Sequence, residues 1–138
     1  MYTVTKEIYF CYGHRLMDYN GPCKYLHGHN GKVEVELSRD KLDGRGMVVD
    51  FSEIREVIKN WIDQSLDHTM LLKKDDPLIS VLKEQRERFY AMDENPTAES
   101  LARLIYDYAR SKGFPVTRVT LWETESSFAT YRVRDSKA

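Results

Sequence analysis

Three of the four histidines in this chain fall in one short stretch whose spacing suits a metal ion. His27 and His29 flank Gly28, and His14 stands at the end of the preceding apolar segment. Residues two apart in a strand point the same way, so His27 and His29 can share a face, and His14 can add a third imidazole from a neighbouring strand. Three imidazoles without a fourth protein ligand are typical of a catalytic zinc, which keeps one position open for water or substrate. The spacing predicts a zinc enzyme, although an H-G-H alone can also be an ordinary surface pair.

Other residues of suitable chemistry lie near these histidines or further along the chain. Cys23 precedes His27 by four positions and offers a thiol, whose alternative is a small apolar filler at a loop exit. Asp67 and His68 are adjacent, a pairing suited to proton transfer, but a histidine in the last turn of a helix also interacts well with the helix dipole. Cys11, unlike Cys23, does not stand beside candidate metal ligands, and it is expected to be a packed strand residue.

Length and charge exclude several classes of protein. The chain has 138 residues and a formal charge of -1, so it is expected to be a single domain, residues 1–138, with no electrostatic case for binding nucleic acid. The N-terminal residues lack the apolar core of a signal peptide, and no run is long enough to span a membrane. We therefore expect a cytoplasmic protein whose two cysteines remain thiols.

Periodicity predicts the elements that position these residues. An apolar segment from Tyr2 reads as a strand that runs into His14, and residues 33–38 alternate with period two, which predicts a second strand that pairs antiparallel with the first. This pairing would bring His14 towards His27 and His29. Asp50 is expected to cap a helix, with Glu53 placed for a capping box, and the helix has an apolar stripe of Phe51, Ile54, Ile58, Trp61 and Ile62.

The second half is expected to add two helices and a hairpin. A long connection between Leu71 and Asn95 contains a short peripheral helix near residues 77–83. Thr97 caps the next helix, and Gly113 ends it. Segments 116–123 and 128–133 read as a hairpin. The predicted order is strand, strand, helix, short helix, helix, strand, strand.

Six motifs follow one another along the chain: Gly13-His14-Arg15-Leu16, Cys23-Lys24-Tyr25-Leu26-His27-Gly28-His29-Asn30, Gly46-Met47-Val48-Val49-Asp50-Phe51, Leu66-Asp67-His68, Asn95-Pro96-Thr97-Ala98-Glu99 and Trp122-Glu123-Thr124. With these motifs the chain resembles, across nearly its whole length, the family of 6-pyruvoyltetrahydropterin and 6-carboxytetrahydropterin synthases. The resemblance implies the α+β tunnelling fold, in which a four-stranded antiparallel sheet with helices on one face forms trimeric barrels that stack into a hexamer. Active sites then lie at subunit interfaces.

The spacing C-x-x-x-H-G-H resembles the bacterial 6-carboxytetrahydropterin synthases of the queuosine pathway. The implied reaction converts 7,8-dihydroneopterin triphosphate into 6-carboxy-5,6,7,8-tetrahydropterin, with loss of triphosphate and acetaldehyde. Two alternatives stay open: a 6-pyruvoyltetrahydropterin synthase, and a non-catalytic zinc-binding or pterin-binding module. Retention of Cys23, Asp67 and His68 together disfavours the module.

The resemblance also implies a role for each candidate residue. Zn²⁺ on His14, His27 and His29 would chelate the side-chain hydroxyls of the substrate. Cys23 would be the base, a role that needs a nearby cation to favour the thiolate.

Asp67 and His68 match the second proton-transfer pair of the family. Glu123 matches its pterin anchor, where a carboxylate accepts paired hydrogen bonds. Thr97 matches a residue on the pterin side, although its role as a helix cap explains it without substrate. One departure stands out: Tyr12 occupies a position where the family has small residues, so it is expected to reshape the pocket.

Overall fold

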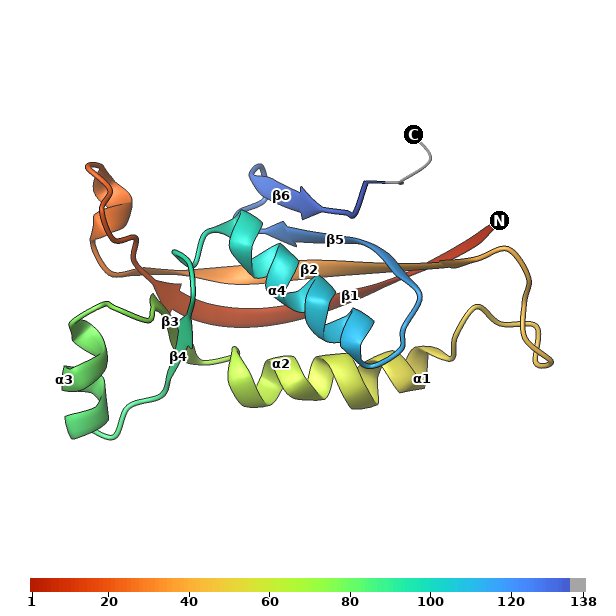
Figure 1. The fold of residues 1–138 in the computed structure, drawn as a ribbon, viewed down its shortest axis with the longest axis horizontal. Helices are drawn as coiled ribbons and strands as arrows, with labels where there is room; N and C mark the ends of the chain where they lie inside the picture. Colours follow the sequence, from red (N-terminus) through yellow and green to blue (C-terminus); the bar gives the residue numbers. More distant parts are fainter. Residues whose placement is uncertain (135–138) are drawn as a thin grey trace.

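A computed structural model describes residues 1–134 of the chain, and its centre is a long antiparallel hairpin (Figure 1). Strand β1 spans Tyr2–His14 and pairs over its whole length with β2, His27–Arg39. β5, Val116–Trp122, pairs antiparallel with β2, and β6, Phe128–Tyr131, pairs antiparallel with β5. The predicted pairing of the first two strands and the predicted C-terminal hairpin are confirmed.

The prediction of a four-stranded antiparallel sheet is wrong, because two more strands extend the sheet beyond β1. β3, Thr69–Lys73, pairs parallel with β1, and β4, Phe89–Met92, pairs parallel with β3. The sheet is therefore mixed and six-stranded, in the order β4-β3-β1-β2-β5-β6. Both added strands are short, and the buried run at Leu71 and Leu72 shows no period of two, so neither stands out in the sequence.

The first long helix runs from residue 51 to residue 65 in three parts. It begins as α1, Phe51–Ile54, continues as a π-helical segment, Arg55–Lys59, and ends as α2, Asn60–Ser65. Asp50 caps it as predicted, because its carboxylate accepts from the Ser52 N–H at 2.9 Å. Two details differ from expectation: the Glu53 carboxylate accepts from Arg45 at 3.4 Å, and Phe51 is half exposed.

Two further helices follow, as the sequence predicted. α3, Leu78–Glu84, lies in the connection between β3 and β4. α4, Ala98–Ser111, begins at Thr97, whose hydroxyl accepts from the Ser100 N–H at 3.1 Å, and Gly113 after its end has a φ of 86°. The indole of Trp61 stacks on the ring of Tyr108 at 4.1 Å, so the first long helix and α4 pack together.

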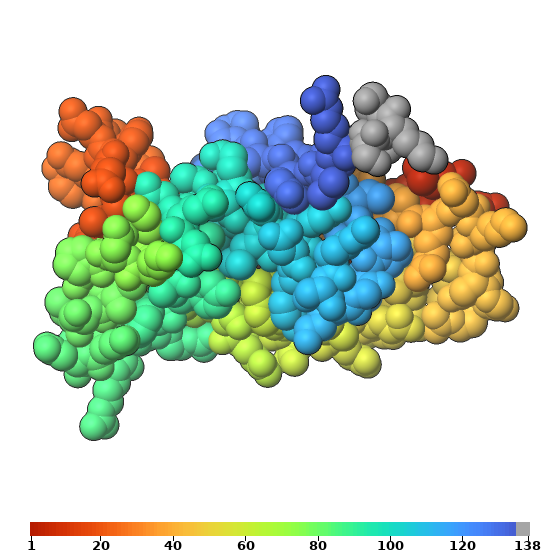
Figure 2. Space-filling model, in the orientation of Figure 1, coloured from red at the N-terminus to blue at the C-terminus, as the bar shows by residue number. Residues whose placement is uncertain are grey.

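Both long helices and one face of the sheet share a single core. α4 packs against β5 and β6, and the core joins isoleucines of the first helix to apolar residues of β1, β2 and β5. The segment between β1 and β2, which contains a short 3₁₀ helix at Pro22–Lys24, projects from one end of the molecule (Figure 2). No helix among residues 1–134 is long and apolar enough to cross a membrane.

Candidate active site

The pairing of β1 with β2 places three histidines on one face of the sheet. His14 pairs with His27 in the antiparallel register, and Tyr12 pairs with His29. Side chains two apart share a face, so all four point to the side that carries the core. One ligand atom from each histidine lies within 4.8 Å of the others, and the ring centroids are 4.5–5.3 Å apart. The structure thus brings together the three residues that the spacing suggested.

Backbone carbonyls orient two of these imidazoles. His14 Nδ1 lies 2.6 Å from the Pro96 carbonyl oxygen, and His27 Nδ1 lies 2.7 Å from that of Tyr25. A carbonyl only accepts, so Nδ1 must carry the hydrogen, and Nε2 is left with its lone pair. Burial lowers the pKa of His14 to about 4, although the Pro96 contact raises it. His14 is therefore in the neutral form, and the Nδ1 contacts leave Nε2 of both imidazoles free for a metal.

Glu123 brings a carboxylate to the histidines. It follows β5, and its Oε2 lies 3.1 Å from His29 Nε2 and 3.7 Å from His14 Nε2. His14 Nε2 is buried and has no hydrogen-bond partner among residues 1–134. A lone pair that faces a carboxylate oxygen is stable only with a cation or a proton between the two. Three imidazoles that converge beside a carboxylate therefore fit a bound metal cation.

Asp67 and His68 form a second cluster, and Cys11 belongs to it. Asp67 accepts from the Cys11 backbone N–H at 2.9 Å, and its other oxygen lies 2.8 Å from His68 Nδ1. The backbone N–H of His68, which has a φ of 55°, donates to the Cys11 carbonyl at 2.7 Å. The Cys11 sulfur lies within 4.8 Å of both side chains. The expectation that Cys11 lies near no chemically active group is wrong. The pairing of β3 with β1 brings Asp67 and His68, which directly precede β3, against Cys11.

The second cluster points away from the histidines. Successive side chains of a strand alternate between faces, so Cys11 faces opposite to Tyr12 and His14. Partial burial raises the pKa of Asp67, but hydrogen bonds from Cys11 and His68 outweigh it and hold that pKa below its usual value. Asp67 is therefore ionised and lies beside the imidazole of His68, on the side of the sheet opposite to the three histidines.

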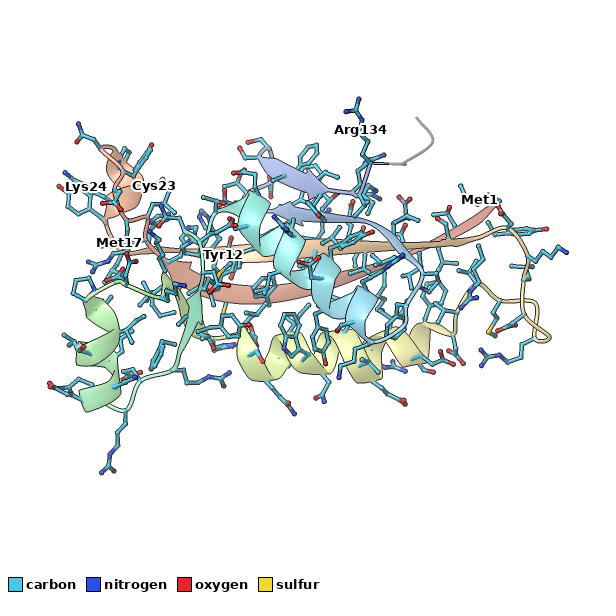
Figure 3. The ribbon with its side chains drawn as sticks, viewed as in Figure 1. Met1, Tyr12, Met17, Cys23, Lys24 and Arg134 are labelled. Atoms are coloured by element: carbon cyan, nitrogen blue, oxygen red, sulfur yellow. The ribbon has the colours of Figure 1, made fainter. Side chains whose placement is uncertain are left out.

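Cys23 lies in neither cluster. It sits in the 3₁₀ helix of the projecting segment, where its carbonyl accepts from the Leu16 N–H at 2.9 Å. In Figure 3, Cys23 and Lys24 lie on this projection, well apart from Tyr12 on the sheet. Both cysteines are free, as expected. Within one chain, the structure does not bring the predicted base to the histidines.

The turn before α4 supports the site in a way that the sequence did not reveal. Asn95 links this turn to the segment after His14. Its side-chain amide accepts from the Met17 N–H and donates to the Met17 carbonyl, both at 2.8 Å. Pro96 then presents its carbonyl to His14. Thr97 caps α4 through its hydroxyl, as predicted. The motif Asn95-Pro96-Thr97 was visible in the sequence, but its contacts depend on long-range folding.

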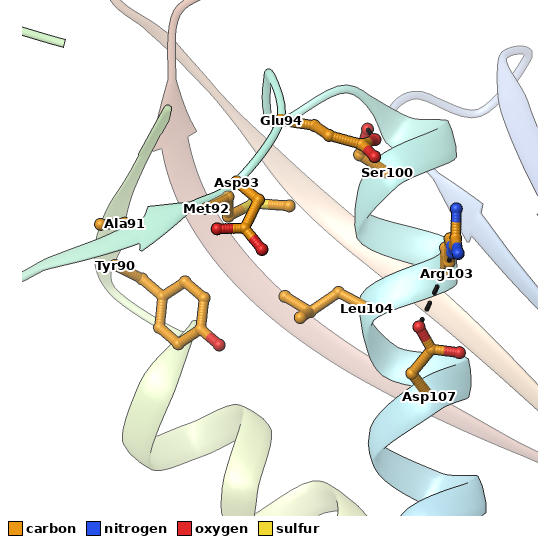
Figure 4. Close-up of a pocket in the computed structure, with 9 residues that line it drawn as sticks. All are labelled: Tyr90, Ala91, Met92, Asp93, Glu94, Ser100, Arg103, Leu104 and Asp107. Carbon is orange, nitrogen blue, oxygen red and sulfur yellow. Dashed lines mark hydrogen bonds and ion pairs between the residues drawn. The ribbon is translucent and has the colours of Figure 1, made fainter. Parts of the chain in front are cut away.

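One cavity lies away from these groups. It has a volume of about 280 Å³ and lies between β4 and α4 (Figure 4). Arg103 and Asp107 form an ion pair at 3.7 Å on its α4 side. None of the predicted site residues lines it; its lining is Tyr90, Ala91, Met92, Asp93, Glu94, Ser100, Arg103, Leu104 and Asp107. Its chemistry gives no reason to place the reaction there.

Known proteins resemble this chain over nearly its whole length. A family described as 6-pyruvoyl tetrahydropterin synthase matches residues 3–134. A protein of Rickettsia conorii named 6-carboxy-5,6,7,8-tetrahydropterin synthase is 35% identical over 135 residues, which cover 93% of this chain and 98% of that protein. The protein of that name from Haemophilus influenzae is 29% identical, with 96% and 99% covered.

Solved structures agree on the fold. An uncharacterized protein from Wolinella succinogenes superposes with a TM-score of 0.80 at 30% identity, and covers 96% of this chain and 98% of that one. The 6-pyruvoyl tetrahydropterin synthase of Caenorhabditis elegans superposes with a TM-score of 0.72 at 23% identity, with 96% of each chain covered. The chain belongs to the 6-pyruvoyl tetrahydropterin synthase family.

Proposed function

We propose that this protein is a metal-dependent lyase that converts 7,8-dihydroneopterin triphosphate and one water molecule into 6-carboxy-5,6,7,8-tetrahydropterin, with release of triphosphate and acetaldehyde. The observation that carries the proposal is the convergence of His14, His27 and His29 beside Glu123. This arrangement occurs in a chain whose relatives at 29–36% identity are named 6-carboxy-5,6,7,8-tetrahydropterin synthase. The product would serve queuosine precursor synthesis in the cytoplasm.

The three histidines would hold the metal, and their all-nitrogen donor set suits Zn²⁺. When bound, the ion would supply a Lewis acid that polarises hydroxyl groups of the substrate side chain. The protein supplies the rest. Glu123, about a quarter exposed, accepts hydrogen bonds from the amino and N–H edge of the pterin ring. Cys23 is the proposed base, and Asp67 holds the imidazole of His68 for a second proton transfer.

A complete site requires more than one copy of the chain. Asp67 and His68 lie on the opposite side of the sheet from the triad, and Cys23 lies on the projection and belongs to neither cluster. We therefore place the active site at an interface, where Asp67 and His68 of one copy serve the histidines of another. The proposed assembly is a hexamer built from two trimers, in which the edge strands β4 and β6 are covered or paired.

Product analysis tests the reaction itself. Incubation of the metal-loaded protein with dihydroneopterin triphosphate should give equal amounts of 6-carboxytetrahydropterin, triphosphate and acetaldehyde by mass spectrometry. Triphosphate without acetaldehyde would instead identify a 6-pyruvoyltetrahydropterin synthase, the activity in the family's description. Unchanged substrate would overturn both and leave a binding module.

Mixed assemblies test the shared site. His29→Ala removes a residue of the triad, His68→Ala removes the proton-transfer imidazole, and each homogeneous variant should be inactive. When the two are refolded together in equal amounts, about a quarter of the sites should receive both intact parts, because each part is intact in half of the copies. Activity near that fraction supports a shared site. Mixtures as inactive as the single variants would show that one chain supplies both groups.

A further inference from the structure

Tyr12 is buried among the proposed site residues, yet the proposed reaction gives it no role. Its side chain is 4% exposed and lies on β1 between Phe10 and His14 on the same face. The ring stacks on Phe10 at a centroid distance of 5.1 Å and meets His14 edge-on at 5.2 Å. The ring of His29, the cross-strand partner of Tyr12, is 5.7 Å away. Tyr12 thus forms part of the wall beside the histidines.

The hydroxyl of Tyr12 points towards the Glu123 end of the site. The outer half of the ring lies over Gly31, where a Cβ atom would come within 3.1 Å of Tyr12 Cε1. Lys32 pairs with Trp122, so the same register places Gly31 beside Glu123.

This hydroxyl has no hydrogen-bond partner among residues 1–134, although it is buried. A buried, unpartnered hydroxyl is unfavourable, and a phenylalanine would fill the same space without it, as Phe10 does two residues earlier. The hydroxyl is therefore best explained by a partner that binds at the site. The phenol carries one O–H donor, so the partner that we infer presents an acceptor next to the groups that Glu123 binds.

The edge of a pterin ring has this order of groups. Its 2-amino group and ring N3–H are adjacent donors that suit a carboxylate, and the C4 carbonyl beside N3 is an acceptor. We propose that Tyr12 is a specificity-determining residue whose hydroxyl donates a hydrogen bond to the C4 carbonyl of the pterin that Glu123 anchors. This inference rests on the proposed function, because it assumes a pterin at Glu123.

The test compares Tyr12→Phe with wild type in the metal-loaded, assembled protein, with neopterin as the probe in calorimetric titrations. Loss of one hydrogen bond should raise the Kd for neopterin about three- to tenfold. The midpoint of thermal unfolding without ligand should stay the same or rise, because the variant removes an unpartnered polar group. Tyr106→Phe, a change at a similarly buried tyrosine of α4, is the matched control and should alter neither value.

In the 4-amino analogue of neopterin an amino donor replaces the carbonyl acceptor and N3 loses its hydrogen. Only the first change concerns Tyr12, so the comparison of wild type with Tyr12→Phe isolates it. Wild type should prefer neopterin to this analogue by a margin that narrows at least threefold in Tyr12→Phe. Three outcomes would overturn the role of Tyr12 alone. They are equal Kd values for neopterin in wild type and Tyr12→Phe, a preference for neopterin over the analogue that does not narrow in Tyr12→Phe, and a lower unfolding midpoint with unchanged binding. Failure of wild type to bind neopterin at all would overturn the proposed function together with this inference.

Discussion

Replacement of Asp76 by asparagine should destabilise the protein far more than the same change at an exposed ion pair. Asp76 is 2% exposed and accepts from the Nε and Nη2 atoms of Arg15 and from the Leu78 N–H. It therefore links the start of α3 to the residue that follows His14. The connection that we expected to be peripheral thus holds the end of β1 in place.

Burial sets the size of the effect. Loss of one partner of a buried pair costs about 3–5 kcal/mol. The Arg15 side chain is 25% exposed and can regain part of its hydration, so we expect the free energy of unfolding to fall by about 2–4 kcal/mol. Asp63→Asn is the control: Asp63 binds Lys59 at 2.6 Å, but both side chains are about 40% exposed, which predicts a loss of about 0.5 kcal/mol or less.

The pH dependence of this difference follows from the Asp76 carboxyl. Hydrogen bonds from Arg15, the largest cause, hold the pKa of Asp76 below its usual value. A lowered pKa in the folded state contributes stability above the unfolded pKa, near 4, and that stability is lost as the pH falls through the folded value. The difference in free energy of unfolding between wild type and Asp76→Asn should therefore be constant from about pH 5 to pH 8 and should decrease below about pH 4.

Urea unfolding at one fixed protein concentration measures these values, because assembly makes stability depend on concentration. A loss under 1 kcal/mol for Asp76→Asn, or equal losses for it and Asp63→Asn, would refute the argument from burial. A gap that persists unchanged at low pH would show that the effect does not come from the carboxylate charge.

Three further predictions concern the metal and the assembly. The purified protein should carry about one zinc per chain by elemental analysis, and His27→Ala or His29→Ala should lose it; full zinc in both variants would contradict the proposed ligands. Cys23→Ala should keep its metal and its assembly while turnover falls about 10²- to 10⁴-fold, whereas zinc loss would make the thiol a ligand. Light scattering should give a hexamer, and a stable monomer at micromolar concentration would remove the interface that the site needs.

The triad was predictable because it depends on local patterns. Alternation fixes which residues of β1 and β2 face the core, and the pairing of two adjacent strands brings His14 to His27. The cap at Thr97 and the stop at Gly113 are also local signals, and both are confirmed. Each of these features needs only neighbouring residues or one hairpin.

The setting of Cys11 could not be predicted in this way. It depends on the parallel pairing of β3 with β1, which joins segments more than fifty residues apart and places Thr69 beside Tyr12. That pairing carries the preceding residues, Asp67 and His68, against Cys11. Short parallel strands have no turn signal and no clear alternation, so their partners are determined by the packed core.

Strand β1 carries both clusters, and its register therefore controls both. Phe10, Tyr12 and His14 face the core side. Cys11, which lies between Phe10 and Tyr12, faces the other side. A slip of one residue against β2 would send His14 to the polar face and bring Cys11 into the core. Burial of Ile8 and Phe10 opposes that slip, because both would lose their apolar surroundings. The same apolar residues that stabilise the fold thus keep the proposed metal ligands and the proton-transfer pair on opposite faces, which is why we expect one copy to complete the site of another.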